Sequence, residues 1–238
     1  MKNFIFDLYG TLADVRTDES SVRFRKKFSL YLSSECGKEV EFWKYYDKLC
    51  ADYSSGDNRE FDIKEHIVRA CAEEGAVISD SGAARAAVVF RRLSLKKLKL
   101  YRGVTQMLAS LKNGGAKIYL LSNAQSAFTR GEIDSLGLTP FFDGMELSSD
   151  FGYKKPSPLF FNHLITKYNL DPAQSVFVGN DIGSDIVPAK AAGMSAAYIL
   201  SDISPAGDDL YRAQQVADFA VKGDVKALSE YLLQLLKG

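Results

Sequence analysis

A candidate nucleophile lies near the start of the chain, where an apolar run ends in an acidic residue. Asp7 follows Phe4-Ile5-Phe6, and Leu8, Tyr9, Gly10 and Thr11 come directly after it. Such a run predicts a buried strand, and open α/β sheets bind ligands at the carboxyl ends of their strands. Gly10 permits a tight turn there, and Thr11 adds a hydroxyl group. A carboxylate in this place can attack an electrophilic phosphorus or carbon atom and form a covalent intermediate.

Two later polar sites supply groups that such a nucleophile needs. Ser122 follows a second apolar run, and its hydroxyl together with the backbone N–H groups of Ser122 and Asn123 can hold an oxygen of a phosphate or carboxylate. Lys155 precedes a proline. Its ammonium group can keep Asp7 ionised and neutralise charge that develops in the transition state.

An acidic loop after another apolar run supplies candidate metal ligands. Asp181 and Asp185 lie four residues apart. Hard oxygen atoms close to Asp7 suit Mg²⁺, which prefers octahedral oxygen coordination. We therefore expect Mg²⁺ as the cofactor.

The elements that must position these residues are short strands, most of which are followed by helical patterns. This alternation predicts βαβ units and a parallel sheet with right-handed crossovers. Because the runs are nearly continuous in apolar residues, we expect helices on both faces of the sheet and thus a three-layer α/β core. The predicted strands are Asn3–Leu8, Ala116–Leu121, Ser175–Val178, Ser195–Leu200 and Ala217–Val221.

The segment from Asp14 to about Lys99 has a different pattern of apolar and polar residues, with several helical stretches and no convincing strand. Asp18 is the expected cap of the first helix. We expect an all-helical lobe over residues 14–99, inserted into a core made of residues 1–13 and 100–238. The four predicted helices run from Asp18 toward Ser33 and over Val40–Tyr53, Ile63–Glu74 and Gly82–Leu93.

Composition excludes several classes of protein. The 238 residues include 30 basic and 30 acidic side chains, so no basic excess indicates binding to nucleic acid. No apolar run reaches the roughly 18–20 residues that span a bilayer, so we expect no membrane partner. The three cysteines form no CxxC pair and are expected to be reduced thiols of a cytoplasmic protein. A small-molecule substrate is the expected partner, and the oligomeric state stays open.

In their order and spacing these motifs resemble those of the haloacid dehalogenase (HAD) superfamily over nearly the whole chain. The strand that ends in Asp-x-x-Gly-Thr, the serine after the second core strand, the lysine before Pro156 and the acidic loop all have counterparts there. The helical insert is similar to the family's cap domain. The resemblance implies a Rossmann-like core, hydrolysis through covalent attack by Asp7, and phosphatase or dehalogenase activity.

The resemblance also implies a metal site. In the family the ion lies on the nucleophilic carboxylate, on the backbone carbonyl two residues later and on an acid of the acidic loop. Here these would be Asp7, the Tyr9 carbonyl and either Asn180 or Asp181. An ungapped match places Asn180 where the family has aspartate, whereas a shift by one residue makes Asp181 the ligand.

One residue departs from the phosphatase pattern. Phosphatases of the family carry a second aspartate two residues after the nucleophile, which protonates the leaving alcohol, and this chain has Tyr9 there. Tyr9 matches the Asp-x-Tyr-Gly-Thr string of the 2-haloacid dehalogenases, whose departing halide needs no proton. Those enzymes bind their substrate with a cap arginine, for which Arg25 is the candidate, but they work without metal.

Three functions follow. A Mg²⁺-dependent phosphatase of a small phosphorylated metabolite is favoured by the acidic loop, a metal-independent 2-haloacid dehalogenase by Tyr9, and a catalytically weak binding protein by the missing aspartate. The candidate catalytic residues are Asp7, Tyr9, Thr11 and Lys155, the candidate substrate-binding residues are Ser122, Asn123 and Arg25, and the candidate metal ligands are Asp7, Tyr9, Asn180, Asp181 and Asp185.

Overall fold

A parallel sheet forms the centre of the computed structural model, which describes residues 2–53 and 56–237. Met1 and Gly238, at the ends of the predicted core, and Ser54 and Ser55 lie outside this range. β1 (Asn3–Phe6) is fully buried between β4 (Lys117–Ser122) and β6 (Ser175–Gly179), so its carboxyl end opens at the middle of the sheet. Across the sheet the strands follow the order β5 (Gly144–Leu147), β4 (Lys117–Ser122), β1 (Asn3–Phe6), β6 (Ser175–Gly179), β7 (Ser195–Leu200) and β8 (Phe219–Lys222).

Helices cover both faces of this sheet, as its apolar strands predict. Phe4 and Phe6 point into one hydrophobic cluster and Ile5 into the other, which follows from the two-residue period of a strand. The first cluster contains residues of α5 (Val104–Asn113), α6 (Ser126–Ser135) and α11 (Val225–Leu235), and the second those of α8 (Pro158–Tyr168), α9 (Val187–Ala191) and α10 (Leu210–Val216). The predicted three-layer α/β core is confirmed.

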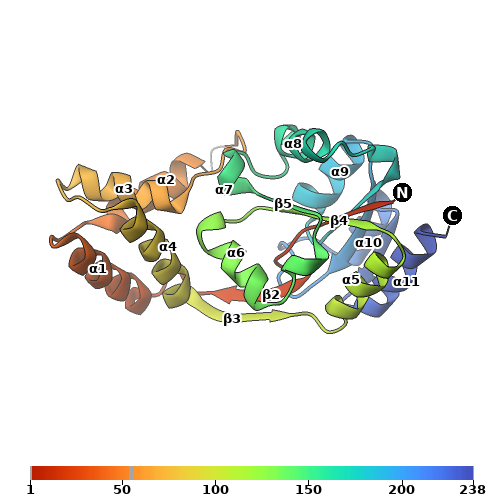
Figure 1. The fold of residues 1–238 in the computed structure, drawn as a ribbon, viewed down its shortest axis with the longest axis horizontal. Helices are drawn as coiled ribbons and strands as arrows, with labels where there is room; N and C mark the ends of the chain where they lie inside the picture. The colour runs from red at the N-terminus through yellow and green to blue at the C-terminus, as the bar shows by residue number, and fades with distance from the viewer. Residues whose placement is uncertain (1, 54–55, 238) are drawn as a thin grey trace.

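The insert holds its own hydrophobic cluster at the far end of the molecule (Figure 1). Aromatic rings dominate it: Phe28, Phe42 and Phe90 meet edge to face, with ring centroids 4.9 to 6.3 Å apart. Each of the four helices predicted there is present. They are α1 (Val22–Cys36), α2 (Phe42–Tyr53), α3 (Ile63–Glu73) and α4 (Asp80–Ser94).

The expectation that residues 14–99 hold no strand was wrong. β2 (Ala13–Thr17) and β3 (Leu95–Leu100) form an antiparallel ribbon that joins the insert to the core (Figure 1). The two strands lie about 80 residues apart in sequence, so only the tertiary fold brings them together. Asp18 extends this ribbon through its N–H bond to the Ser94 carbonyl and does not cap α1, which begins after Ser21. The edge strand β5 was missed as well.

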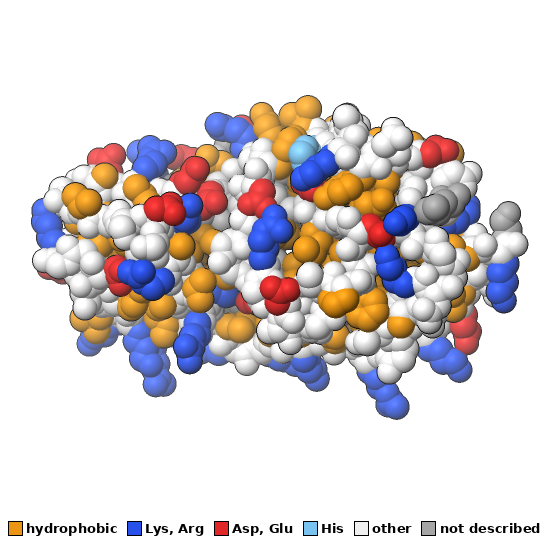
Figure 2. All heavy atoms as spheres, in the orientation of Figure 1, with side chains coloured by type: hydrophobic (Ala, Val, Ile, Leu, Met, Phe, Trp, Pro, Cys, Tyr) orange, Lys and Arg blue, Asp and Glu red, His pale blue; other side chains and the backbone are white. Residues whose placement is uncertain are grey.

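Short elements complete the described chain: α7 (Ser148–Phe151), the 3-10 turns Thr139–Phe141 and Pro172–Gln174, and a π-helical turn, η3 (Ile182–Ile186). No helix among the described residues is both long and apolar enough to cross a membrane. On the face drawn in Figure 2, basic and acidic side chains are interspersed, as the zero net charge leads one to expect.

Candidate active site

Asp7 stands at the carboxyl end of the central strand, in a loop that packs tightly on the acidic loop. Its N–H continues the β1–β6 ladder by donating to the Val178 carbonyl at 2.9 Å. Gly10 has a φ of 91°, and a Cβ there would lie 2.3 Å from the Asn180 side chain. Glycine is therefore required at this turn, because a side chain would strain the backbone and push Asn180 away.

Lys155 connects two carboxylates at the base of the site. Its Nζ donates to Asp7 Oδ1 at 2.8 Å and to Asp185 Oδ1 at 2.7 Å, and the residue is only 3% exposed. Burial lowers the pKa of Lys155, but the charges of Asp185 and Asp7 outweigh it, so the pKa lies above its ordinary value. The ammonium group stays charged and holds Asp7 in place.

Asp185 shapes the acidic loop from within. Its Oδ2 accepts the N–H groups of Asn180 and Asp181, each at 3.1 Å. Gly179 makes this possible, since a Cβ there would lie 2.3 Å from Asp185 Oδ2. Burial raises the pKa of Asp185 to about 7, against the attraction of Lys155 and with the help of the Asp7 charge. Both carboxylate oxygens thus already have partners.

Ser122 and Asn123 leave β4 toward the same point. Ser122 Oγ donates to Asp7 Oδ1 at 3.1 Å. The Asn123 side chain instead pairs with the backbone of Lys155, donating to its carbonyl at 2.9 Å and accepting its N–H at 2.7 Å. Its amide therefore positions the lysine loop, and what Asn123 has left for a ligand is its backbone N–H.

Thr11 lies between the nucleophile and the acidic loop. Its hydroxyl is 3.2 Å from Asp7 Oδ2 and 3.2 Å from Asn180 Oδ1, so it can donate to either acceptor. Asp181 turns elsewhere: its Oδ1 accepts the N–H groups of Gly183 and Ser184 at 2.8 and 2.9 Å and caps η3. Asn180, and not Asp181, therefore shares a hydrogen-bonding partner with Asp7.

This set of oxygens fits a hard divalent cation that keeps part of its water shell. Asp7 Oδ2 and Asn180 Oδ1 are carboxylate and amide oxygens at one edge of the cavity, the ligand types that Mg²⁺ prefers. No group of three or more His, Cys, Asp or Glu side chains placed to hold a metal occurs in the described residues. A cation here would thus be held by few charges.

Tyr9 directs its hydroxyl away from the nucleophile. The hydroxyl donates to Glu132 and lies 3.1 Å from Thr129 Oγ1, both on α6. Arg91 of α4 donates to Glu132 Oε1 at 2.6 Å and lies over the Tyr9 ring at 5.3 Å from its centroid. Burial first, and then the Glu132 charge, raise the pKa of Tyr9 strongly. Sequence reasoning did not find these partners, because no local pattern links positions 9, 91 and 132.

Arg25 lies outside the site. Its guanidinium makes two hydrogen bonds of 2.8 Å to Asp47 and covers the Trp43 ring, all within the insert. It does not line the cavity at Asp7. The structure therefore separates Arg25 from the other predicted site residues.

Of the predicted site residues, all except Thr11 and Arg25 line one cavity of about 200 Å³. Every residue that lines it belongs to the core segments. Ile203 and Pro205, from the loop after β7, were not predicted, and neither follows a motif that marks it. The lining consists of Asp7, Tyr9, Ser122, Asn123, Lys155, Asn180, Asp181, Ser184, Asp185, Ile203 and Pro205.

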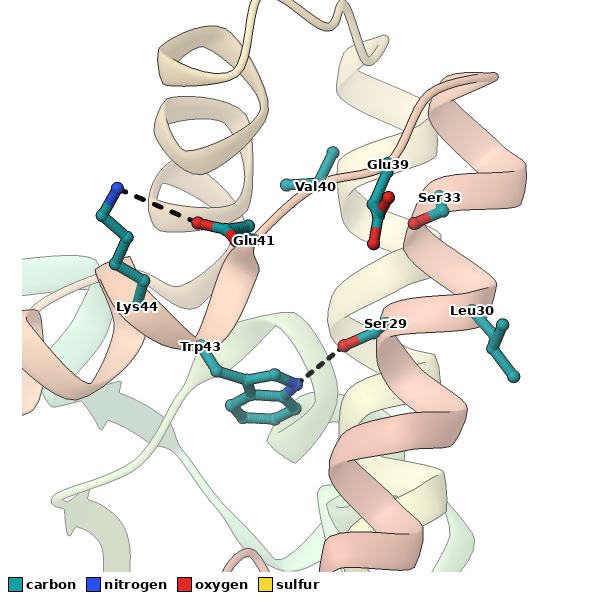
Figure 3. A pocket seen from close by; sticks show the side chains of 8 residues that line it. All are labelled: Ser29, Leu30, Ser33, Glu39, Val40, Glu41, Trp43 and Lys44. Carbon is teal, nitrogen blue, oxygen red and sulfur yellow. Dashed lines mark hydrogen bonds and ion pairs between the residues drawn. The ribbon is translucent and has the colours of Figure 1, made fainter.

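A larger hollow of about 620 Å³ lies in the insert, between α1 and the segment leading into α2 (Figure 3). Trp43 forms one wall and donates to Ser29 Oγ at 2.9 Å, and Glu41 pairs with Lys44. It shares no lining residue with the cavity at Asp7. Volume alone therefore does not mark the reactive site.

Comparison with known proteins identifies similar sequences and structures. A family model described as "haloacid dehalogenase-like hydrolase" matches residues 1–193. Glyceraldehyde 3-phosphate phosphatase of Methanothermobacter thermautotrophicus is 25% identical over 235 residues, 98% of this chain and 100% of that protein. Phosphoglycolate phosphatase of Aquifex aeolicus is 29% identical over 204 residues, 84% and 85% of the two chains.

Among solved structures, 2-haloacid dehalogenase of Pseudomonas syringae pv. Tomato matches with a TM-score of 0.66 and 21% identity, over 98% of this chain and 99% of that one. At this identity the likeness is one of fold.

Proposed function

The chain belongs to the haloacid dehalogenase-like hydrolases, and we propose that within this family it is a Mg²⁺-dependent phosphatase of small phosphorylated metabolites. One observation carries the proposal: Lys155 and Ser122 both donate to the Asp7 carboxylate in a single cavity beside the acidic loop. The curated relatives, which are phosphatases of small metabolites, support it.

In this mechanism Asp7 attacks the phosphorus atom and becomes an aspartyl phosphate, while the ester bond from phosphorus to the substrate oxygen breaks and its electron pair leaves with that oxygen. Lys155 and Ser122 move from Asp7 Oδ1 to the phosphoryl oxygens as charge builds there. Water then attacks the phosphorus, the bond from phosphorus to Asp7 breaks to regenerate the carboxylate, and inorganic phosphate leaves with the hydrogens of the water.

The proposed metal ligands are Asp7, the Tyr9 carbonyl and Asn180, because Asp181 caps η3 and Asp185 is bonded through both oxygens. When bound, Mg²⁺ would neutralise negative charge on the phosphoryl group and on Asp7. The Thr11 hydroxyl lies 3.2 Å from both Asp7 Oδ2 and Asn180 Oδ1 and can donate to one of them.

A dehalogenase is less well supported by the site. In the resemblance, such an enzyme binds the substrate carboxylate with a cap arginine, but Arg25 is bound to Asp47 in the insert, and Lys155 already bonds Asp7 and Asp185. Tyr9 alone favours that chemistry, and its hydroxyl faces α6.

The test is phosphate release by the purified chain from phosphoglycolate, glyceraldehyde 3-phosphate, acetyl phosphate and p-nitrophenyl phosphate, with Mg²⁺ or with chelator. We expect release only with Mg²⁺ and none from Asp7→Asn. Equal turnover in chelator would refute the metal role. Chloride release from 2-chloropropionate in chelator, without phosphatase activity, would establish the dehalogenase, and no turnover of either class would indicate a binding protein.

A further inference from the structure

The titratable side chains that line the cavity at Asp7 all have partners already. Lys155 lies between Asp7 and Asp185, and Asp185 accepts two backbone N–H groups with its other oxygen. Asp181 accepts the first N–H groups of η3. Tyr9, which stands two residues after the nucleophile, is the first side chain of the lining to consider as a proton donor to a departing oxygen, and Asp181 is the second.

Tyr9 is not placed to do so. Its hydroxyl partners, Thr129 and Glu132, are 0% and 8% exposed, and Arg91, which holds Glu132, is 8% exposed. None of these three residues lines the cavity. The hydroxyl is therefore enclosed where the nucleophile loop meets α4 and α6, and it donates to Glu132.

The absence of a proton donor matters differently for different leaving groups. An alcohol is about as weak an acid as water, so its anion departs slowly unless it is protonated. A carboxylate, whose conjugate acid has a pKa of about 4, departs as a stable anion. A positioned general acid contributes about 10²–10⁴-fold to the rate.

We propose that this chain acts best on acyl phosphates, in which the phosphoryl group is bonded to a carboxylate. This inference rests on the proposed function and names the substrate class of the same site. Alkyl monoesters, the class named for the curated relatives, are turned over slowly.

The reaction balances without an acid from the protein. An Asp7 oxygen forms a bond to phosphorus while the bond from phosphorus to the acyl oxygen breaks, and its electron pair leaves with the carboxylate. A water oxygen then bonds to phosphorus, and the electron pair of the aspartyl–phosphorus bond returns to Asp7. Both hydrogens of the water stay on the product, which is released as H₂PO₄⁻ and equilibrates with solvent.

The test compares three substrates of the unaltered chain, each corrected for its enzyme-free hydrolysis: acetyl phosphate, p-nitrophenyl phosphate and glycerol 3-phosphate. We expect kcat/KM to fall in this order, by at least about 100-fold from first to last. If acetyl phosphate and glycerol 3-phosphate differ by less than about tenfold, the inference is wrong although the chain is a phosphatase. If no substrate exceeds the Asp7→Asn background, the proposed function itself fails.

Two variants test the side chains that could act as the general acid. Tyr9→Phe removes the hydroxyl and keeps the ring, and Asp181→Asn removes the second candidate while keeping an acceptor for the η3 N–H groups. We expect the ratio of acetyl phosphate to glycerol 3-phosphate turnover to stay within about threefold in both, even where both rates fall. A selective loss of glycerol 3-phosphate turnover in either variant would identify that residue as the acid and overturn the inference. Because the comparison of substrates needs no variant, a variant that fails to fold leaves it intact.

Discussion

At the scale of single residues, the balance of positive and negative side chains determines which ligands the site can bind. One ammonium group, that of Lys155, contacts two buried carboxylates, so the cavity carries an excess of negative charge before any ligand enters. An anionic substrate would be repelled by this excess. A divalent cation beside Asp7 would offset this negative charge and so allow the anionic phosphoryl group to bind.

Replacing Lys155 by methionine should remove both activity and stability. Two buried carboxylates would then face each other without a counter-charge, which costs about 3–5 kcal/mol of unfolding free energy, and kcat should fall by about 10²–10³-fold. Urea unfolding and phosphate release measure the two effects. Lys154→Ala is the matched control, because the Lys154 ammonium donates to the Tyr53 carbonyl and not to Asp7. Equal losses of activity and stability in the two variants would contradict the role given to Lys155.

Asn180 offers a second residue-scale prediction. A neutral amide holds a cation less strongly than a carboxylate, so Asn180→Asp should lower the Mg²⁺ concentration for half-maximal activity and the calorimetric Kd by about 10–100-fold. Asp181→Asn should leave both nearly unchanged, because Asp181 caps η3. If Asp181→Asn weakens binding and Asn180→Asp does not strengthen it, Asp181 is the ligand.

At the scale of elements, α6 connects the insert to the core. Its Ile133 packs in the core cluster, while Ala127 and Phe128 pack against the cluster of the insert. Between them Glu132 receives Arg91 from α4 and the hydroxyl of Tyr9. The nucleophile loop, the core and the insert therefore share one buried polar contact.

Breaking this contact from one side should be costly. Glu132→Leu leaves the buried Arg91 guanidinium unpaired and should lower the unfolding free energy by about 3–5 kcal/mol, whereas Arg91→Met with Glu132→Leu should recover much of the loss. Denaturant titration of the single and double variants measures this. Arg130→Ala, which breaks an exposed pair between α6 and Asp150 of α7, should cost less than about 1 kcal/mol. A double variant no more stable than the single one would contradict this account.

Helix α3 carries a pH dependence of its own. His66 is buried among aromatic rings, its Nε2 has no hydrogen-bonding partner, and burial, then Arg69, lower its pKa to about 4. The unfolded chain binds a proton at His66 below about pH 6.5 and the folded chain does not until about pH 4, so stability falls as the pH drops through this window.

The loss should reach about 3 kcal/mol, since one pKa unit corresponds to 1.36 kcal/mol. His66→Phe should flatten this part of the curve of unfolding free energy against pH between pH 6.5 and 4. Parallel curves for the two proteins would show that His66 does not titrate as described.

At the scale of the whole molecule, the parallel sheet brings together residues far apart in sequence. β1 lies between β4 and β6, so the loops after these three strands meet at one edge, and Lys155 joins them from the segment before α8. The insert leaves and rejoins this edge through β2 and β3 (Figure 1). Such a layout lets a chain lengthen its insert without moving the nucleophile.

Much of this arrangement can be predicted from the amino-acid sequence. Apolar runs that end in Asp7 and Ser122 predict core strands because burial on both faces demands continuous apolar side chains. The four helices of the insert follow from local periodicity, and the order of the motifs identifies the family. These features depend on neighbours in sequence, which any local pattern records.

What the motifs left open was decided by contacts between distant residues. The β2–β3 ribbon, the bonds that turn Tyr9 toward Glu132 and the pairing of Arg25 with Asp47 all join positions 20 or more residues apart. The position of Asn180 depends on the close approach of Gly10. Each depends on which side chains a fold places within about 4 Å of each other, and this distance follows from packing the whole chain.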